Sequence, residues 1–373
     1  MNDLQKRTWA EVSLGNIEYN YKIARSLLSE GTKLLGIVKA DAYGHGAVEV
    51  AKRLEKCGAD YLAIACLDEA LELRNNGVTL PILILGHTPP EYVDLLLKYD
   101  LTQTVSCEAK AIEFSNAAKA LGGTLRIHIK LDTGMCRLGY LCTGEHFEEG
   151  VKNLVSSAKL PNLDAEGVYT HFSVSDMLDE DNAAFTKEQF AAFMRVLTEA
   201  EKQGVTFRLR HCANSAAVIN YPEMALDMVR TGMMLYGYRD GGRLGLKPAM
   251  RLVSTVSTIK YHDPGCFISY GRTYVTDKRT RMGVVAVGYA DGLPWASRGK
   301  VKLYVEGKLV PVCGSIAMDM CMVDLSDVPE AQVGSEVEIF GEHAGIIQLA
   351  EDAGTIIEEI MCAITKRVPR VYK

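Results

Sequence analysis

The sequence of 373 residues lacks several features that would indicate a function class directly. It has no uncharged apolar run of the roughly 18–20 residues that a membrane-spanning helix needs, and its start, MNDLQKRTWAEV, lacks the apolar stretch of a secretory signal. It also lacks an excess of basic residues, because 41 Lys and Arg against 47 Asp and Glu give a net charge of −6. Nucleic-acid-binding domains normally carry a basic face. We therefore expect a cytoplasmic protein with no membrane segment and no nucleic-acid partner.

The ten cysteines lack the spacing of a metal or redox site. They are scattered along the chain, and no two of them form a C-x-x-C pair. This distribution is typical of reduced core residues in a cytosolic protein, not of a disulfide framework or a zinc site. We expect no bound metal.

Short apolar runs alternate with helical segments through the first 240 residues. Residues 46–58, 108–122 and 181–204 are examples of segments with helical periodicity. Strands that are apolar on both faces and alternate with helices predict a parallel (β/α)8 barrel of the TIM type. An open doubly wound sheet is the structural alternative. The eight predicted strands lie in LLGIVKAD, YLAIA, PILILG, TQTV, LRIHIKLD, AEGVYTH, RLRHCAN and MVRTGMMLYG.

The pattern changes after residue 240. From Met250 onward, β-type runs such as LVSTVSTIKY, MGVVAVGY, KLYVEG, CMVDLS and EVEIFG are separated by turns rich in Gly, Pro and Asp. Only GIIQLAEDAG and IIEEIMCAITKR look helical. We expect a barrel domain over residues 1–240 and a mostly antiparallel β domain over residues 241–373. A further expectation is that residues 1–12 pack with the second domain.

Polar side chains stand at the ends of several predicted barrel strands. Active sites of such barrels form at the carboxyl ends of the strands. Any one of these residues alone could serve as an ordinary hydrogen-bonding partner, but together they favour an active site. They are Lys39, Lys130 with Asp132, His171, Asn214 and Arg230.

Lys39 is the most informative of these residues, because a buried ammonium costs desolvation energy unless it is paired or chemically used. A desolvated lysine is a good nucleophile, and one known use is covalent binding of pyridoxal phosphate (PLP). Asn214 and Ser215 begin a short helix whose N–H groups suit a phosphate, and Gly232 allows close backbone approach. Arg230 is the candidate partner of the ring nitrogen. A simple helix cap at Asn214 and tight packing at Gly232 remain alternatives.

Eight motifs together resemble the bacterial alanine racemase family. They run in order along nearly the whole chain, from near residue 10 to near residue 370. The resemblance implies a barrel followed by a β domain, a head-to-tail homodimer, and PLP in each active site. It also implies interconversion of L- and D-alanine, which supplies D-alanine for cell-wall peptidoglycan. The motifs are VKADAYGHG, LDTGMCRLG, YTHF, HCANSAA, MVRTGMMLYG, ISYGRTY, VGYADG and GSIAMDMCMVD.

By this resemblance, two residues are the catalytic bases. Lys39 looks like the lysine that holds PLP and serves one face of the substrate, and Tyr270 looks like the base that the partner subunit delivers to the other face. A tyrosine pKa of about 10 is too high for an efficient base at neutral pH, so cationic neighbours are needed. His171 and Arg230 resemble the relay that supplies them. A guanidinium never transfers its proton, so Arg230 would leave the ring nitrogen unprotonated and favour racemisation.

The resemblance also implies roles around the substrate. Arg137 looks like the residue that holds the substrate carboxylate, and Lys130 beside it is a candidate for carbamylation, which would turn it into an anion that clamps the arginine. The remaining residues fall into three groups. They are the cofactor contacts Tyr43, Asn214, Ser215, Gly232 and Met233, the partner-subunit pocket residues Met318 and Asp319, and the entrance residues Tyr289 and Asp176.

Three positions depart from the pattern common in the family. Lys366 stands where many members have a tyrosine that touches the phosphate, Ala317 is smaller than the cysteine often found there, and Trp295 replaces a frequent arginine. These changes predict that small polar substrates such as serine are accepted alongside alanine. A serine or broad-specificity small amino-acid racemase is therefore one alternative function. The other is a non-catalytic PLP carrier, although such proteins consist of a single barrel without the β domain and Tyr270.

Overall fold

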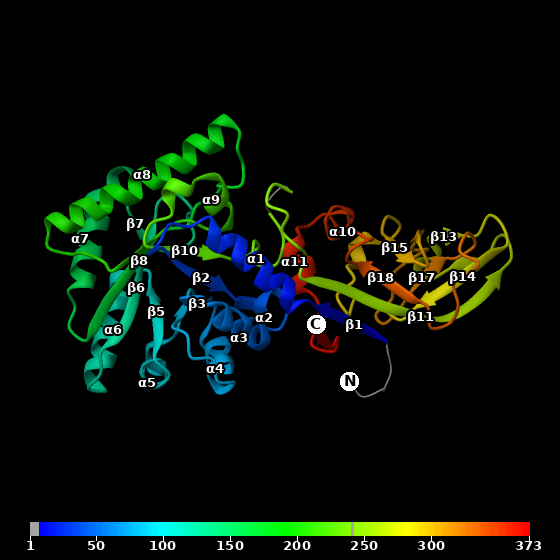
Figure 1. Ribbon diagram of the computed structural model, residues 1–373, viewed down its shortest axis with the longest axis horizontal. Helices are drawn as coiled ribbons and strands as arrows, with labels where there is room; N and C mark the ends of the chain where they lie inside the picture. Colours follow the sequence, from blue (N-terminus) through cyan, green and yellow to red (C-terminus); the bar gives the residue numbers. More distant parts are fainter. Residues whose placement is uncertain (1–6, 240–241) are drawn as a thin grey trace. The chain divides into compact units, whose positions relative to one another are not determined.

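The computed structural model describes residues 7–239 and 242–373, and these residues form two compact units (Figure 1). The barrel unit contains Asn16–Ala42 and Ala47–Lys247. The β unit contains the described residues up to Gly15, the short segment Tyr43–Gly46, and Pro248–Lys373. Within the described residues, no helix is long and apolar enough to cross a membrane.

The barrel unit is a nearly closed parallel sheet. Each strand from β2 to β9 pairs with the next in the order β2-β3-β4-β5-β6-β8-β9, and β10 pairs back onto β2. A single parallel bridge between Asn214 and Arg230 spans the remaining gap between the chain after β9 and β10. The strands are β2 (Lys33–Ile37), β3 (Tyr61–Ile64), β4 (Ile82–Ile84), β5 (Leu101–Val105), β6 (Leu125–Asp132), β8 (Leu163–Tyr169), β9 (Leu209–His211) and β10 (Met228–Thr231).

These eight strands coincide with the eight apolar runs, so the predicted barrel is confirmed and the open doubly wound sheet is excluded. Most strand residues are buried, as expected where the barrel interior lies on one side and helices cover the other. The short strand β7 (Tyr140–Leu141) pairs with the end of β6. The helices are α1 (Leu14–Ser26), α3 (Ala47–Cys57), α4 (Leu67–Asn75), α5 (Val93–Lys98), α6 (Glu108–Ala120), α7 (Phe147–Ala158), α8 (Glu180–Lys202) and α9 (Ser215–Asn220), with the short turns η1 (Pro90–Tyr92), η2 (Gly144–His146) and η3 (Pro222–Met224).

The long helix α8 illustrates why these segments fold as they do. The side chain of Asp179 accepts a hydrogen bond from the backbone N–H of Asn182 and so caps the helix start. Phe193, Val196 and Ala200 recur at helical spacing and are buried, whereas Phe185 on another face is exposed.

The β unit is built around β11 (Met250–His262), the longest strand of the chain. It pairs antiparallel with β1 (Thr8–Val12), β14 (Thr280–Val285) and β18 (Glu336–Phe340). The last strand, β19 (Arg370–Tyr372), runs parallel to β1, so the two ends of the described chain share one sheet. This mostly antiparallel unit confirms the predicted fold class. Its other elements are β12 (Phe267–Ile268), η4 (Tyr270–Arg272), β13 (Tyr274–Val275), η5 (Trp295–Ser297), β15 (Lys302–Val305), β16 (Lys308–Pro311), β17 (Cys321–Asp324), α10 (Ile346–Ala353) and α11 (Ile357–Cys362).

Candidate active site

Lys39 stands at the end of β2, where the chain enters a left-handed turn. Figure 1 labels this segment α2 (Lys39–Tyr43), but residues 40–43 have φ angles of 52°, 53°, 53° and 52°. For residues other than glycine, the left-handed conformation costs about 1–2 kcal/mol each. Four such residues in succession form a strained segment directly beside Lys39.

Hydrogen bonds within the barrel unit hold this turn. The backbone N–H of Ala40 donates to Glu69 Oε1 at 2.6 Å, and Asp41 Oδ1 accepts from the backbone N–H of Ala47 at 2.8 Å. Glu69 also accepts from the backbone N–H of Ala65 through its other oxygen. The carboxylates of Glu69 and Asp41 therefore hold the backbone of the turn that follows Lys39.

Arg230 lies at the end of β10 and is almost completely buried, with 4% of its surface exposed. Its guanidinium donates from Nη1 to Nδ1 of His211 at 3.0 Å and from Nη2 to Nδ1 of His171 at 3.1 Å. The remaining acceptors are the backbone carbonyls of Thr170, His211 and Cys212. All five acceptors are uncharged, so the guanidinium is held in place without a carboxylate in contact.

The bond from Arg230 also determines the state of His171. Because Nδ1 of His171 receives a proton donor, it must be unprotonated, and the ring carries its proton on Nε2. Burial first, and then the charges of Arg230, Arg137, Lys130 and Lys39, hold the pKa of His171 well below its usual value. The histidine is therefore neutral, and the same interactions show that these cations surround it.

Lys130 is the second lysine of the barrel site. It lies in β6 with only 2% of its surface exposed, and it donates a hydrogen bond to the carbonyl of Leu131. Burial, the positive charge of Arg230 and that of Arg137 lower the pKa of Lys130 to about 7, although Asp132 acts in the opposite direction. A substantial fraction of this amine is thus uncharged at neutral pH.

The loop that carries Arg137 is shaped by Asp132. Oδ1 of Asp132 accepts from the backbone N–H groups of Gly134 and Cys136, both at 3.0 Å, and Cys136 has a positive φ of 54°. The side chain of Arg137 at the end of this loop is exposed, yet it lies near enough to influence the pKa of Lys130 and His171.

Four of the expected phosphate contacts follow two neighbouring strands: Asn214 and Ser215 come after β9, and Gly232 and Met233 come after β10. Asn214 caps α9 through its side-chain oxygen, which accepts from the backbone N–H of Ala217 at 2.9 Å, so it has the capping role that the sequence left open. The hydroxyl of Ser215 accepts from the backbone N–H groups of Gly232 at 2.8 Å and Met234 at 3.4 Å. Met233, between these two donors, is buried. Two N–H groups that converge on one oxygen provide the type of donor set that a phosphate uses.

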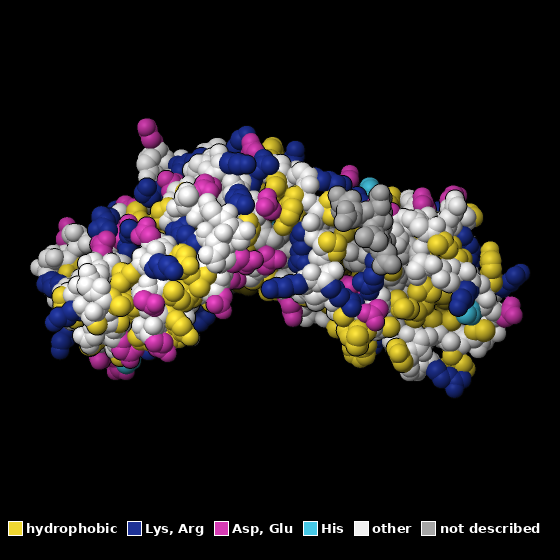
Figure 2. Space-filling view, turned by 90° about the horizontal axis from the view of Figure 1, so that it is seen from below, with side chains coloured by type: hydrophobic (Ala, Val, Ile, Leu, Met, Phe, Trp, Pro, Cys, Tyr) yellow, Lys and Arg dark blue, Asp and Glu magenta, His cyan; other side chains and the backbone are white. Residues whose placement is uncertain are grey.

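The β unit carries Tyr270 on η4, between the paired strands β12 and β13. The residue is 74% exposed, while its carbonyl is held by the hydroxyl of Ser315 at 2.9 Å. Figure 2 shows hydrophobic side chains on the surface of the β unit. The exposed hydrophobic residues of this unit include Tyr270, Tyr289 (44%), Trp295 (49%), Met318 (52%) and Met320 (45%).

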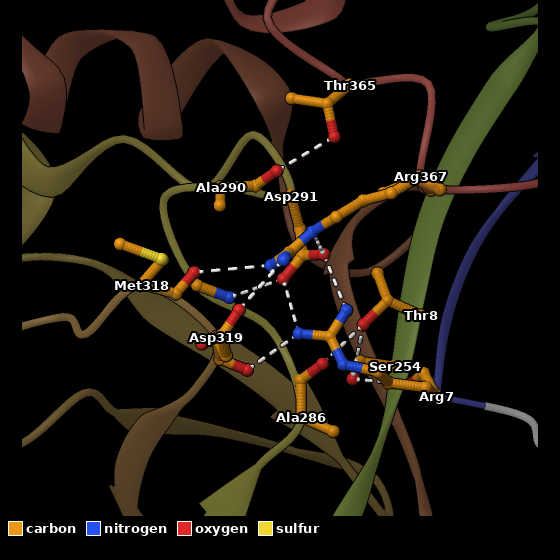
Figure 3. A network of polar contacts seen from close by, with 12 residues as sticks. Arg7, Thr8, Ser254, Ala286, Ala290, Asp291, Met318, Asp319, Thr365 and Arg367 are labelled. Atoms are coloured by element: carbon orange, nitrogen blue, oxygen red, sulfur yellow. Dashed lines mark hydrogen bonds and ion pairs between the residues drawn. The ribbon is translucent and has the colours of Figure 1, made fainter.

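An ion-pair network around the buried carboxylate of Asp291 supports Met318 and Asp319 (Figure 3). Asp291 has no exposed side-chain surface; it accepts from Arg7 at 2.6 and 2.9 Å and from Arg367 at 2.8 Å. Arg367 also donates to the Asp319 carboxylate at 2.8 Å and to the Met318 carbonyl, and Arg7 donates to the Asp319 carbonyl. Asp291 thus positions the turn that presents Met318 and Asp319.

The sequence did not predict this network, although Asp291 belongs to the VGYADG motif.

Other residues expected at the site also lie in the β unit. Tyr43 is half-buried, and burial raises its pKa. Lys366 is exposed, and the hydroxyl of the preceding residue, Thr365, donates to the carbonyl of Ala290. Ala317 is half-buried. In the barrel unit, Asp176 forms an exposed ion pair with Arg239.

The (β/α)8 barrel presents a lysine, a neutral histidine and a buried arginine at its strand ends, and the β unit that follows carries an exposed tyrosine. Two family models identify this two-domain chain as an amino-acid racemase. The family model for the N-terminal domain of alanine racemase matches residues 12–240, and the model for the C-terminal domain matches residues 249–372. The chain belongs to the alanine racemase family. The match of the second domain excludes the single-barrel PLP carrier.

Individual relatives agree with this assignment. The chain is 44% identical to alanine racemase 1 of Clostridium acetobutylicum, over 98% of this chain and 95% of the relative. It is 41% identical to alanine racemase of Desulfovibrio desulfuricans over the full length of both chains. The structure is similar to that of alanine racemase from Clostridium difficile, with a TM-score of 0.94, 39% identity, and coverage of 100% of this chain and 97% of the other.

Proposed function

We propose that this protein interconverts L- and D-alanine with PLP as cofactor and two bases, Lys39 and Tyr270. The observation that carries the proposal is the arrangement around Arg230, which presents a permanently charged donor beside a neutral histidine at the barrel's strand ends. The reaction would supply D-alanine for peptidoglycan in the cytoplasm. Residues 1–240 would hold the cofactor, and residues 241–373 would deliver Tyr270.

The donor set at the strand ends fits PLP. Lys39 would bind it covalently, Arg230 would donate to its ring nitrogen, and Ser215 with the backbone N–H groups near Gly232 and Met233 would hold the phosphate. Asn214 shapes that loop through its cap, and Tyr43 is a further phosphate contact of the proposal. When bound, PLP draws electrons from the substrate Cα and makes its proton removable.

Racemisation needs a proton to leave one face of Cα and another to arrive at the opposite face. Lys39 serves one face, and Tyr270 serves the other. Arg230 would donate a hydrogen bond to the ring nitrogen but would keep its own proton, so it would leave that nitrogen unprotonated and limit competing PLP reactions. His171 carries its proton on Nε2 and, as a neutral donor backed by Arg230, favours the phenolate form of Tyr270.

Lys130 and Arg137 form the substrate-holding part of the proposal. An uncharged lysine amine reacts with CO2 to give a carbamate and a proton, and a pKa of about 7 makes this form accessible at neutral pH. The carbamate anion would fix Arg137, which would bind the substrate carboxylate together with Met318 and Asp319 of a second copy. A crystal structure with an unmodified Lys130 amine would contradict this part.

The first experiment is racemisation of L-alanine and L-serine, side by side, with added PLP and chiral chromatography. Fast alanine turnover with little serine turnover would support alanine as the substrate. Serine turnover within a thousandfold of alanine, about 4 kcal/mol in barrier, would support the broader specificity expected from Lys366, Ala317 and Trp295. No turnover of either amino acid by PLP-loaded protein would contradict the proposal.

A second experiment tests the homodimer. Lys39→Ala and Tyr270→Phe chains should each be inactive alone, because each homodimer lacks one base in both sites. After unfolding and refolding together, mixed dimers should contain one site with both bases and regain activity. If differently tagged chains co-purify but activity does not return, Tyr270 does not act in the partner's site.

A further inference from the structure

A chain of hydrogen bonds leads from Arg230 into the barrel interior. Nη1 of Arg230 lies 3.0 Å from Nδ1 of His211, Nε2 of His211 lies 2.9 Å from Nδ1 of His128, and Nε2 of His128 lies 3.2 Å from Oε2 of Glu166. Both histidines are fully buried. A charged group at each end is thus connected through two imidazole rings.

The proton positions in this chain follow from its two ends. A guanidinium has only donors, so Nδ1 of His211 must accept, and the ring proton sits on Nε2. Nε2 of His211 then donates to Nδ1 of His128, whose own proton also sits on Nε2 and points to Glu166. Burial lowers the pKa of both histidines, so each ring is neutral. Every bond of the chain therefore donates in the direction of the carboxylate.

Glu166 is built as the anionic end of this chain. Burial alone would raise its pKa, but the hydrogen bonds from His128 and Tyr61 and the charge of Arg126 lower it overall. Its side chain is 17% exposed, and the hydroxyl of Tyr61 donates to it at 3.0 Å. Arg126 and Arg208 are charge partners at 3.9 and 3.7 Å.

Gly167 gives independent evidence for this chain of hydrogen bonds, because the residue beside Glu166 must leave room for the ring of His128. A Cβ at this position would lie 2.7 Å from two ring atoms of His128, closer than real Cβ atoms come to any neighbour. A rigid imidazole cannot move its ring atoms separately, so only glycine next to Glu166 leaves room for His128.

We propose that Glu166 is the remote counter-ion of Arg230 and that His128 and His211 are positioning residues that transmit its effect. Arg230 touches no carboxylate, and the polarised chain makes Nδ1 of His211 a stronger acceptor. This bond fixes one arm of the guanidinium and so the orientation of the donor that faces PLP. The inference rests on the proposed role of Arg230, but the state of the chain is measurable without turnover.

The first test is nitrogen-15 NMR of the histidine side chains in wild-type protein, with His128→Gln and His211→Gln spectra for assignment. We expect both rings to carry the proton on Nε2 and neither to titrate between pH 5.5 and 8. A proton on Nδ1 of either ring, or a charged ring at pH 6.5, would overturn the relay even if the enzyme is fully active.

The second test is Glu166→Gln, which removes the charge and keeps the shape. We expect kcat for alanine to fall about tenfold with KM within about twofold, and the pH dependence of the visible absorption of bound PLP to shift. The control is Asp60→Asn, at another barrel carboxylate, which pairs with Lys33 and lies outside the chain; it should change neither quantity. Unchanged kcat and spectrum in Glu166→Gln would overturn the proposal.

Gly167→Ala provides a geometric variant that leaves every charge in place. We expect it to displace His128, alter the histidine spectrum and lower kcat at least as much as Glu166→Gln. An altered His128 signal with wild-type kcat and absorption would also overturn the proposal. If wild type itself racemises no amino acid, the proposed function fails, and the NMR result still decides the relay.

Discussion

The barrel unit buries a cation, Arg230, and the β unit buries an anion, Asp291, and the two units satisfy these charges differently. Arg230 donates to five uncharged acceptors, two imidazole nitrogens and three carbonyls. Asp291 accepts directly from two guanidiniums and from the backbone N–H of Gly288. One charge is fixed in place but uncompensated by its immediate partners, whereas the other is neutralised on contact.

The difference explains what each charge can do. The positive charge of Arg230 extends to its neighbours, since it is among the causes that lower the pKa of Lys130 and His171. Burial alone would raise the pKa of Asp291, but Arg7 and Arg367 lower it. These ion pairs hold in place the turn that carries Met318 and Asp319. The charge of Arg230, which no contacting group neutralises, can act on reacting groups. The charge of Asp291, which two guanidiniums neutralise, holds the structure.

The largest expected effect comes from removing the charge of the barrel site. In Arg230→Gln, the amide replaces only part of the donor set, and Lys130 and His171 lose the influence of the Arg230 charge. We expect racemase activity to fall about a thousandfold or more, equivalent to about 4 kcal/mol in barrier. Chiral chromatography of alanine measures this activity. A loss of less than about tenfold would contradict the inference that the charge of Arg230 serves the reaction.

Asp291→Asn should act on stability. The variant leaves two guanidiniums, 35% and 39% exposed, facing a neutral amide, and the loss of hydrogen bonds to a charged acceptor costs about 2 kcal/mol. Urea unfolding at neutral pH measures the change. Because the pKa of Asp291 is lowered in the folded protein, its contribution is present above the unfolded value of about 4 and is lost as the pH falls through the lower folded value. A stability unchanged at pH 7 would contradict this reading.

The pH dependence of stability tests whether the charge of Arg230 acts on Lys130. Its folded pKa of about 7 lies below the unfolded value of about 10.4, so the unfolded chain binds more protons between these values and stability rises with pH in that window. Relative to Lys130→Met, wild type should gain about 1 kcal/mol per pH unit from pH 7 to 9 in CO2-free buffer. Lys119→Met, at an exposed lysine, is the control. Parallel stability curves for wild type and Lys130→Met would argue against the lowered pKa.

The smallest effect is expected at the exposed end of the Asp291 network. Asp319 pairs with Arg367, but their side chains are 50% and 39% exposed, and such pairs contribute less than about 1 kcal/mol. Asp319→Asn should therefore leave urea unfolding nearly unchanged, while KM for alanine rises if the residue lines the substrate pocket. A loss of stability as large as that of Asp291→Asn would show that burial does not separate the two carboxylates.

The barrel could be predicted from sequence because its strands are buried on both faces and leave short runs of Ile, Val and Leu. The strand ends then placed Lys39, Lys130, His171 and Arg230 at one edge, and in the structure the charges of the other three lower the pKa of His171. The β-unit strands β1 and β19 were missed. Each is short, and β1 pairs with β11 about 240 positions away, so local pattern alone carries little signal.

Three features of the site were not predicted from the sequence. Arg7 and Asp291 are separated by 284 positions, and only the sheet of the β unit brings them together. His128 and His211 lay inside predicted strands, and a histidine within an otherwise apolar run was the available signal for a polar barrel interior. The left-handed turn after Lys39 gave no signal, because the segment Ala40–Tyr43 contains no glycine to indicate positive φ angles.

That turn has a consequence for the handedness of the backbone itself. Residues 40–43 adopt the conformation that D-amino acids prefer, because the mirror image of the left-handed region is the ordinary helical one. Ala40 is exposed, so a methyl group of either hand has room there. A chain assembled by chemical ligation with D-alanine at position 40 would relieve strain next to Lys39. A protein of the alanine racemase family thus has a site in its own main chain where either enantiomer of alanine fits.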